Sequence, residues 1–222
     1  DGSITSQVRA NQSAGFSIVT YTGAGTNATV GHGLNAAPEF IITKSRNNAW
    51  NWTVYHSSLG INQFLLLDSD SAASSQTGYW NTAPTSSVFG VANNNTGSSG
   101  NNLVAYCFAP VEGFSHFTTF TGTSTSSPVF VYCGFKPAFV LRKNATSGST
   151  NWYLHDTARD TFNVCNSELY PHKNSSENTH DALDILSNGF AMRTSNANHN
   201  GASDTYIVAC FAENPFKYAR AR

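Results

Sequence analysis

Short apolar segments separated by polar turn residues recur along the whole chain. Apolar and polar positions alternate in the segment GFSIVTYTG at 15–23, whereas 40–42, 64–67 and 139–141 are continuous apolar runs. β-Branched and aromatic residues bounded by Gly, Pro, Asn or Ser are typical of β-strands. Continuous apolar runs are expected of strands that are covered on both faces. The pattern therefore predicts a chain of many short strands.

The strand-like segments repeat in order. The matching blocks are 15–23 with 113–122, 38–44 with 137–143, 52–56 with 152–156, and 105–110 with 208–213. Their first residues lie 98, 99, 100 and 103 positions apart. Nearly constant spacing of several blocks indicates an internal repeat. We predict a tandem duplication of a unit of about one hundred residues.

Turn chemistry separates the predicted strands. Asn188-Gly189 predicts a tight hairpin, residues 93–100 an exposed loop, and residues 181–186 one short helical turn. About five to seven strands per copy, without a helix long enough for a parallel crossover, favour antiparallel sheets. The expected fold class is all-β, an antiparallel β-sandwich.

The expected domain organisation follows the repeat. We divide the chain into an N-terminal connector at 1–14, a first β-rich repeat at 15–112 and a second at 113–222. A lone copy would expose one face of its apolar runs, so we expect the two repeats to pack together as one globular unit.

Composition narrows the classes of partner. Only 11% of the 222 residues are charged, the formal net charge is −1, and no basic run precedes the last few residues. Nucleic-acid binders carry a basic surface, and a membrane-spanning helix needs about 18 consecutive apolar residues; neither feature is in the sequence. We expect neutral partners, with no nucleic acid and no membrane insertion. The start, Asp1-Gly2-Ser3, lacks the features of a signal peptide and is expected to continue from a longer protein.

The four cysteines show no metal-binding spacing. Cys107, Cys133, Cys165 and Cys210 form no Cys-x-x-Cys pair, and three of them lie in or beside apolar runs. Buried free thiols behave as small hydrophobic residues. We expect free thiols, with a disulfide between Cys107 and Cys210 as the alternative because these positions are equivalent in the repeat.

Several motifs carry a resemblance to a known family. They are GFSIVTYTG at 15–23, GHGL at 31–34, APEFII at 37–42, NTAPTS at 81–86, LSNGF at 186–190 and FAENPFKY at 211–218. Together they resemble a C-terminal domain of tail-fibre and other virion proteins of tailed bacteriophages, many of them marine. The similarity spans about Ile4 to Arg222.

The resemblance implies a concanavalin-A-like jelly roll of the lectin type. It further implies a virion protein in a tail fibre or other surface appendage, assembled in the host cytoplasm. Such a protein is expected to be a homotrimer that contacts other virion proteins and host surface polysaccharide or lipopolysaccharide. The family supplies no catalytic residue that could be transferred to this chain.

Aromatic residues beside Asn-rich loops are candidate sugar platforms. Aromatic faces stack on pyranose rings, while planar polar groups bind the hydroxyls. Trp50, Tyr79 and Trp80 meet this description, with packing or a subunit interface as the alternative role. Trp52 recurs as Trp152, which favours a shared core position.

Charged residues offer weaker candidates. Asp156, Arg159 and Asp160 could bind a sugar or Ca²⁺, or could form a salt-bridged turn. Asp68 and Asp70 resemble the start of a calcium loop, but the glycine and glutamate of an EF-hand are missing. The seven histidines lack metal-ligand spacing. We therefore predict no metal site and no cofactor, with Ca²⁺ as the one alternative.

No catalytic motif is evident. Acidic pairs such as Asp156 with Asp160, or Glu168 with Asp181, could serve a glycosidase, but nothing singles one out. The sequence favours a non-enzymatic phage appendage domain that recognises host surface glycan without cleaving it. The alternatives are a structural virion module, such as a capsid decoration or fibre spacer, and a polysaccharide depolymerase.

Overall fold

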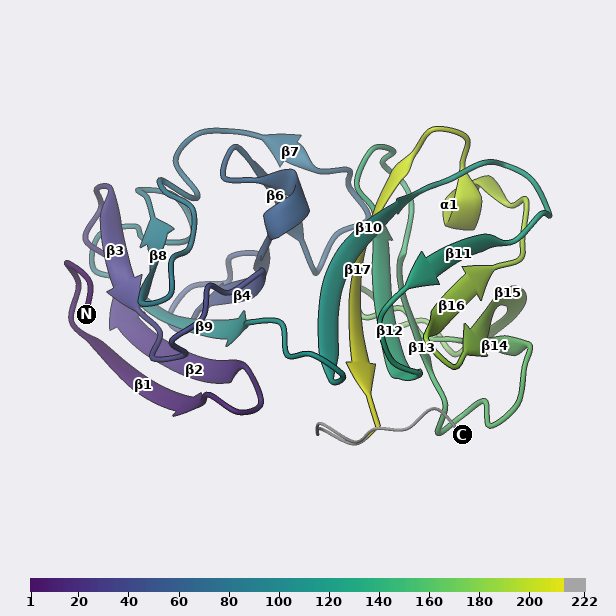
Figure 1. The fold of residues 1–222 in the computed structure, drawn as a ribbon. Coiled ribbons are helices and arrows are strands. Elements are labelled where there is room, and N and C mark those ends of the chain that lie inside the picture. Colours follow the sequence, from purple (N-terminus) through teal and green to yellow (C-terminus); the bar gives the residue numbers. More distant parts are fainter. Residues whose placement is uncertain (214–222) are drawn as a thin grey trace. The chain divides into compact units, whose positions relative to one another are not determined.

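The computed structural model describes residues 1–213. These residues form two compact units: unit 1 is Asp1–Leu67 with Ala73–Val111, and unit 2 is Asp68–Ala72 with the chain from Glu112 onward. Both units consist of antiparallel sheets (Figure 1). The predicted all-β class is therefore confirmed. No helix among the described residues is long and apolar enough to cross a membrane.

Unit 1 is built around a seven-stranded sheet of order β1-β2-β9-β4-β5-β6-β7, with β3 and β8 forming a separate pair. Its elements are β1 (Ser6–Asn11), β2 (Phe16–Thr22), β3 (Ala28–Gly31), β4 (Phe40–Ser45), β5 (Thr53–His56), the 3-10 turn η1 (Ser57–Leu59), β6 (Gln63–Leu66), β7 (Ser74–Ser75), β8 (Val88–Val91) and β9 (Asn102–Phe108).

The core of unit 1 follows from the alternation of its strands. In β2, Val19 and Tyr21 are buried, whereas Ile18, the residue before Val19, is 39% exposed. The inward side chains of the large sheet pack against the β3–β8 pair, which contributes Phe89 and Val91. Each large apolar side chain buried in this way stabilises the unit by about 1.5–3 kcal/mol.

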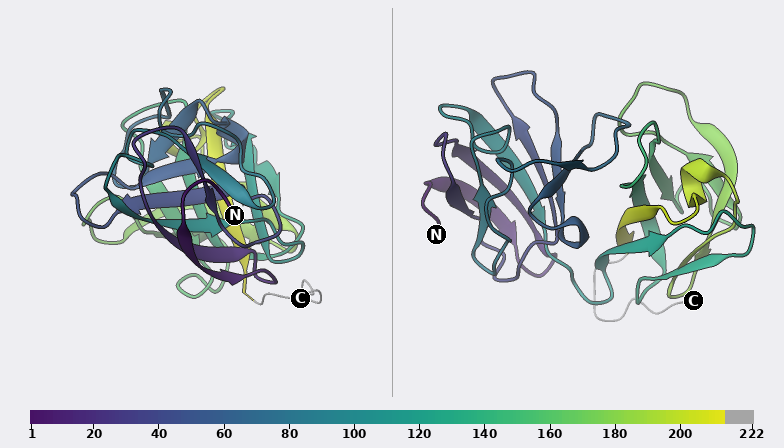
Figure 2. Two further views of the ribbon diagram at one scale, coloured as in Figure 1. Left: turned by 90° about the vertical axis from the view of Figure 1, so that its left-hand side faces the viewer. Right: turned by 90° about the horizontal axis from the view of Figure 1, so that it is seen from above.

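Unit 2 contains two four-stranded sheets, β10-β17-β12-β13 and β11-β16-β15-β14. Its elements are β10 (Ser115–Thr121), β11 (Val129–Tyr132), β12 (Pro137–Asn144), β13 (Trp152–Asp156), β14 (Cys165–Glu168), β15 (Asn178–Leu186), β16 (Gly189–Met192), the helix α1 (Ala197–Asn200) and β17 (Thr205–Ala212). Figure 2 shows these strands from two further directions.

Side chains from both sheets of unit 2 share one core. Val140 and Tyr206 come from the first sheet, and Leu183 and Phe190 from the second. The ring of Phe120 stacks on that of Tyr206 at a centroid distance of 4.7 Å. Two facing sheets with an apolar interior form a sandwich, so this arrangement agrees with the predicted architecture at the level of unit 2.

Four strands have the same order in both units: β2-β9-β4-β5 in unit 1 and β10-β17-β12-β13 in unit 2. The registers also correspond, because Phe40 pairs with Phe108 in unit 1 and Phe139 pairs with Phe211 in unit 2. Every repeated block of the sequence overlaps one of these strands.

Other local predictions have mixed outcomes. The hairpin at Asn188-Gly189 is confirmed, since Leu186 pairs directly with Gly189. Residues 181–186 form part of β15 rather than a helical turn, because strand pairing buries Leu183 and Ile185. Residues 1–14 are more than a connector, since β1 pairs with β2 along its whole length. The described strands number nine in unit 1 and eight in unit 2.

All four cysteines are buried free thiols. Cys107 belongs to the core of unit 1, whereas Cys133, Cys165 and Cys210 belong to the core of unit 2. The alternative of a disulfide between Cys107 and Cys210 is therefore not what the structure contains. Burial raises the pKa of the Cys107 thiol to about 12, so it stays protonated at neutral pH.

Two leucines of unit 2 provide a matched test of the core. Leu183 is fully buried, whereas Leu169 is 36% exposed. We expect Leu183→Ala to lower the free energy of unfolding by about 2–5 kcal/mol, because it leaves a cavity. Leu169→Ala should cost less than about 1 kcal/mol. Urea unfolding of both variants measures this; equal losses would show that Leu183 is not a core residue.

Candidate functional site

The aromatic candidates of unit 1 differ in accessibility. Trp80 is 4% exposed and packs edge-on against Tyr55 at 5.6 Å, so its ring belongs to the core. Tyr79 is half-buried, and one of its faces is stacked on Phe64 at 3.7 Å. Trp50 is half-buried, and its carbonyl accepts a hydrogen bond from Lys44 Nζ. A ring face open for stacking on a sugar is thus not offered by Trp80.

The shared tryptophan position also differs between the units. Trp152 is fully buried, as predicted, but Trp52 is only half-buried. Its ring stacks on Tyr106, with the centroids 6.3 Å apart, and Lys44 Nζ lies 6.0 Å from its centroid. The prediction that both tryptophans are core residues is therefore wrong for Trp52.

A pocket of about 600 Å³ opens beside Tyr79 and Trp80, and we call it the amide pocket. Its side-chain amides come from Asn27, Asn62, Gln76, Asn81, Asn93 and Asn94. The remaining lining residues are Ile61, Thr77, Gly78 and Trp80. None of the lining side chains is ionisable. The volume falls in the range of about 300–1,000 Å³ that is usual for small-molecule sites.

Backbone and hydroxyl contacts hold the walls of the amide pocket together. Asn94 N donates to Gly78 O at 2.8 Å, and Ala92 N donates to Tyr79 O at 3.1 Å. Thr96 Oγ1 also donates to Tyr79 O. The loop before β8 and the loop after it are therefore joined, and these loops carry Asn81, Asn93 and Asn94 of the pocket.

Two polar atoms of the pocket residues lack hydrogen-bond partners. They are Trp80 Nε1, a donor, and Asn81 Oδ1, an acceptor. A buried polar group without a partner costs about 1–3 kcal/mol. Both atoms are enclosed by the protein, and Asn81 Oδ1 packs against Gly90, so neither is open to the pocket.

The acidic candidates Asp68 and Asp70 lie in a segment that contacts Lys143, a neighbour that the sequence did not indicate. Asp68 and Asp70 are exposed, and the backbone carbonyl of Asp70 accepts hydrogen bonds from Lys143 Nζ at 3.3 Å and Thr150 N at 3.2 Å. Lys143 also donates to Asn144 O and Thr150 Oγ1. Burial lowers the pKa of Lys143 to about 8. This lysine therefore secures the 68–72 segment within unit 2.

The other charged candidates do come together. Arg159 Nε binds Asp156 Oδ2 at 2.7 Å, and Arg159 NH1 binds Glu177 Oε2 at 2.7 Å. Asp160 accepts hydrogen bonds from Ser167 N at 2.7 Å and Ser167 Oγ at 2.9 Å. This is the geometry of the salt-bridged turn. The groups that could bind a ligand here are occupied by internal partners.

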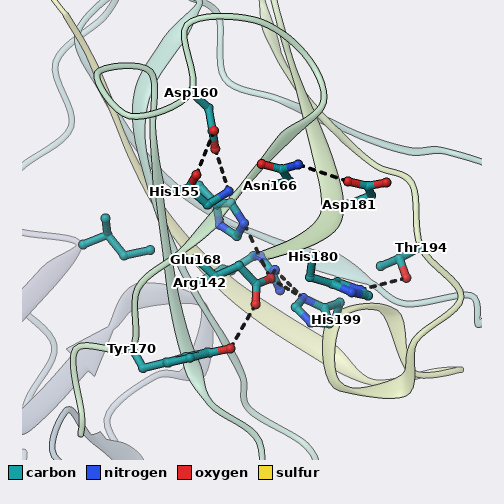
Figure 3. Close-up of polar contacts among 12 residues, drawn as sticks. Arg142, His155, Asp160, Asn166, Glu168, Tyr170, His180, Asp181, Thr194 and His199 are labelled. Atoms are coloured by element: carbon teal, nitrogen blue, oxygen red, sulfur yellow. Dashed lines mark hydrogen bonds and ion pairs between the residues drawn. The ribbon is translucent and has the colours of Figure 1, made fainter. Parts of the chain in front are cut away.

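A larger polar cluster lies inside unit 2 (Figure 3). Arg142, His155 and Glu168 are fully buried, and His199 is 4% exposed. Glu168 Oε1 lies 3.8 Å from Arg142 NH2, 3.6 Å from His155 Nε2 and 3.4 Å from His199 Nδ1. Tyr170 donates its hydroxyl to Glu168 Oε2 at 3.2 Å. We call these five residues the buried cluster.

The hydrogen bond between Arg142 and His199 sets the state of the imidazole. Arg142 NH2 and His199 Nδ1 are 2.6 Å apart. Because guanidinium only donates, Nδ1 must accept, and the proton of His199 resides on Nε2. The guanidinium also lies over the ring of Tyr153, 4.4 Å from its centroid. Arg142 is thus the centre of the buried cluster.

Several atoms of the buried cluster lack hydrogen-bond partners within the described chain. They are Arg142 Nε and NH1, both ring nitrogens of His155, and Glu168 Oε1. Breaking a buried charge pair costs about 3–5 kcal/mol because it leaves one charge uncompensated. A change in the protonation of one of these groups therefore has a large effect on the stability of unit 2.

Burial controls protonation in the cluster. It lowers the pKa of His155 to about 2, with Arg142 acting in the same direction, and lowers the pKa of His199 strongly for the same reasons. Burial raises the pKa of Glu168, and Arg142 opposes that effect. Both histidines are consequently neutral at neutral pH.

The sequence did not single out Arg142, His155 or His199 as a group. The signal was available in the repeat, because Arg142, which pairs with Tyr153, takes the place of Thr43, which pairs with Thr53. Likewise His155, opposite Val140, corresponds to Tyr55, opposite Ile41. Inward-facing neutral residues of unit 1 are thus replaced by ionisable ones in unit 2.

No group of three or more His, Cys, Asp or Glu residues suited to a metal ion is found in the part of the chain that the structure describes. In the buried cluster, the guanidinium of Arg142 already supplies the positive charge beside Glu168. The carboxylates of Glu168 and Asp181 do not face each other across a cleft, since Glu168 is buried and Asp181 is exposed.

Because both histidines are neutral in the folded protein, we expect unit 2 to lose stability in acid. The pKa of His155 is lower in the folded protein than its unfolded value of about 6.5, so the unfolded chain binds more protons below that pH. Stability conferred by neutral His155 is present above pH 6.5 and is lost as pH falls, by up to about 1.4 kcal/mol per pH unit. The raised pKa of Glu168 opposes this loss near pH 4.3 and above.

We expect His155→Leu to reduce the slope of unfolding stability against pH between pH 6.5 and 5 without abolishing it, because the pKa of His199 is also lowered by burial. Urea unfolding at several pH values measures the slope. An unchanged slope would contradict a depressed pKa at His155. The control is the stability of the variant at neutral pH: if it equals that of the parent chain, the difference in slope arises from protonation alone.

Comparisons with known proteins bear on the family. No curated protein matches the chain, and no solved structure matches it. A family model described as "Domain of unknown function (DUF7483)" matches residues 1–215, which is nearly the whole chain. The chain therefore belongs to the DUF7483 family, a domain family of unknown function.

Proposed function

We propose that this protein is a domain of a phage virion appendage, such as a tail fibre, that recognises host cell-surface glycan without cleaving it. The observation that carries the proposal is the amide pocket of unit 1, which is lined by six Asn and Gln side chains. Amide-lined concave surfaces beside aromatic residues suit sugar hydroxyls. The sequence resemblance to phage virion proteins supplies the biological setting.

Binding without cleavage is supported by the state of the acidic groups. Asp156 and Asp160 are held by Arg159 and Ser167, and Glu168 is fully buried beside Arg142. A glycosidase needs two carboxyl groups that reach the scissile bond. The buried cluster is instead suited to holding unit 2 in one arrangement.

Duplication fits this function. The common strand order and register of the two units support descent from one repeated unit. A lectin-like jelly roll is the form that the sequence resemblance implies for it. After duplication, equivalent positions such as Thr43 and Arg142 could diverge. Presentation on a homotrimer and on several fibres would strengthen weak single sites through avidity.

A glycan array tests the proposal. We expect the purified full chain to bind polysaccharide or lipopolysaccharide from the host surface. Chromatography of the same polysaccharide after incubation should show no released oligosaccharide. Absence of binding to any host glycan would argue against recognition, and release of oligosaccharides would favour the depolymerase.

A structural virion module is the second candidate, favoured by exposed aromatic side chains on an edge strand. Phe130 is 48% exposed and Tyr132 is 62% exposed, and both lie on β11 at the edge of its sheet. Val131 between them is buried, so the two rings share the outward face. Exposed aromatic pairs of this kind are typical of protein contacts.

Sedimentation analysis tests the structural candidate. If these rings form a subunit contact, the double variant Phe130→Ser, Tyr132→Ser should raise the dissociation constant of the trimer by at least about tenfold. Phe162→Ser is the matched control, because Phe162 is 86% exposed and lies outside the strands. An oligomeric state that is unchanged in the double variant would remove this support.

A further inference from the structure

We propose that the amide pocket selects an uncharged sugar residue, a neutral hexose or N-acetylhexosamine, over uronic, sialic, sulfated or phosphorylated sugars. The inference deepens the proposed function and rests on it, since it names the ligand class of the same site. It is carried by three features of the pocket: its uncharged lining, the mixed donor and acceptor character of its amides, and the frame that holds them.

The uncharged lining disfavours an anionic ligand. The lining residues include six amides, one threonine and one tryptophan but no Lys, Arg or His. An anion that leaves water needs a positive partner or an equivalent set of hydrogen bonds. Without a basic side chain in the pocket, a carboxylate or sulfate would lose hydration that the amides replace only in part.

The amides match hydroxyl and acetamido groups. Each Asn or Gln side chain offers one carbonyl acceptor and two N–H donors, while each sugar hydroxyl both donates and accepts. Six such side chains line the pocket, so it offers both donors and acceptors. A neutral sugar can satisfy both kinds of atom without bringing in an unpaired charge.

The frame of the pocket holds the amides in position before a ligand arrives. At Gly78, whose φ is 105°, an added Cβ would lie 2.9 Å from Asn94 Nδ2 and 3.0 Å from Asn93 Oδ1. The two amides therefore converge over a residue that has no side chain. Ile61, which is half-buried, adds apolar surface that can contact the carbon atoms of a pyranose. Rigid placement reduces the entropy lost on binding.

Neighbouring asparagines give a matched pair of variants. Asn93 lines the pocket, whereas Asn95 lies two residues further along the same loop and does not. We expect Asn93→Ala and Asn62→Ala each to weaken binding by about three- to tenfold, the loss typical of one hydrogen bond. Asn95→Ala should remain within about twofold of the parent chain. Thermal unfolding of each variant shows that it is folded.

The experiment compares neutral and acidic probes on the full chain. Array glycans ending in galactose, glucose, mannose, N-acetylglucosamine or N-acetylgalactosamine are set against sialylated, uronate-containing and sulfated counterparts, at 50 and 500 mM NaCl. We expect binding of one or more neutral probes, with affinity changing by less than about twofold between the two salt concentrations, because no ion pair is screened.

The outcomes separate this inference from the proposed function. Preference for acidic probes, with affinity that falls steeply in salt, would overturn the neutral-sugar class and leave glycan recognition intact. Equal behaviour of the Asn93→Ala and Asn95→Ala variants, with strong binding by both, would move the glycan site away from the amide pocket. Failure of every probe to bind would remove the proposed function together with the inference.

Discussion

One interior strand of each unit, β9 in unit 1 and β17 in unit 2, is the constraint on which the rest of the structure depends. β9 pairs with β2 on one side and β4 on the other, and β17 pairs in the same way with β10 and β12. A strand bonded along both edges satisfies its backbone groups within the sheet, which allows it to be buried. Cys107 and Cys210 occupy equivalent, fully buried positions on these strands.

The two units share a strand order but carry different side chains at equivalent positions. On β5 of unit 1, Tyr55 contacts Trp80, and Trp80 is one of the residues that line the amide pocket. At the equivalent position of unit 2, His155 joins the buried cluster around Arg142. One unit thus presents neutral polar groups to solvent at this place, while the other encloses charged groups, whose removal from water is costly unless they are paired.

Much of the fold could be predicted from local patterns. The repeated blocks predicted β2, β4, β5 and β9 and their counterparts in unit 2, since alternation and turn residues act over short distances. The helical turn at 181–186 was wrong because pairing of β15 with β14 and β16 outweighs local preference. Among candidate site residues, Tyr79 and Trp80 were near the amide pocket, but Trp80 was assigned an exposed ring that the core encloses.

The sequence by itself determined the strand-forming segments and the low charge, because each of these is a property of neighbouring residues or of composition. Only the tertiary structure decided which polar residues meet. Arg142, Glu168 and His199 are brought together from β12, β14 and α1. Asn27, Asn62 and Asn94 likewise come from three separate loops to one pocket. Such groups depend on strand pairing across long stretches of chain, which the spacing of residue types along the sequence does not encode.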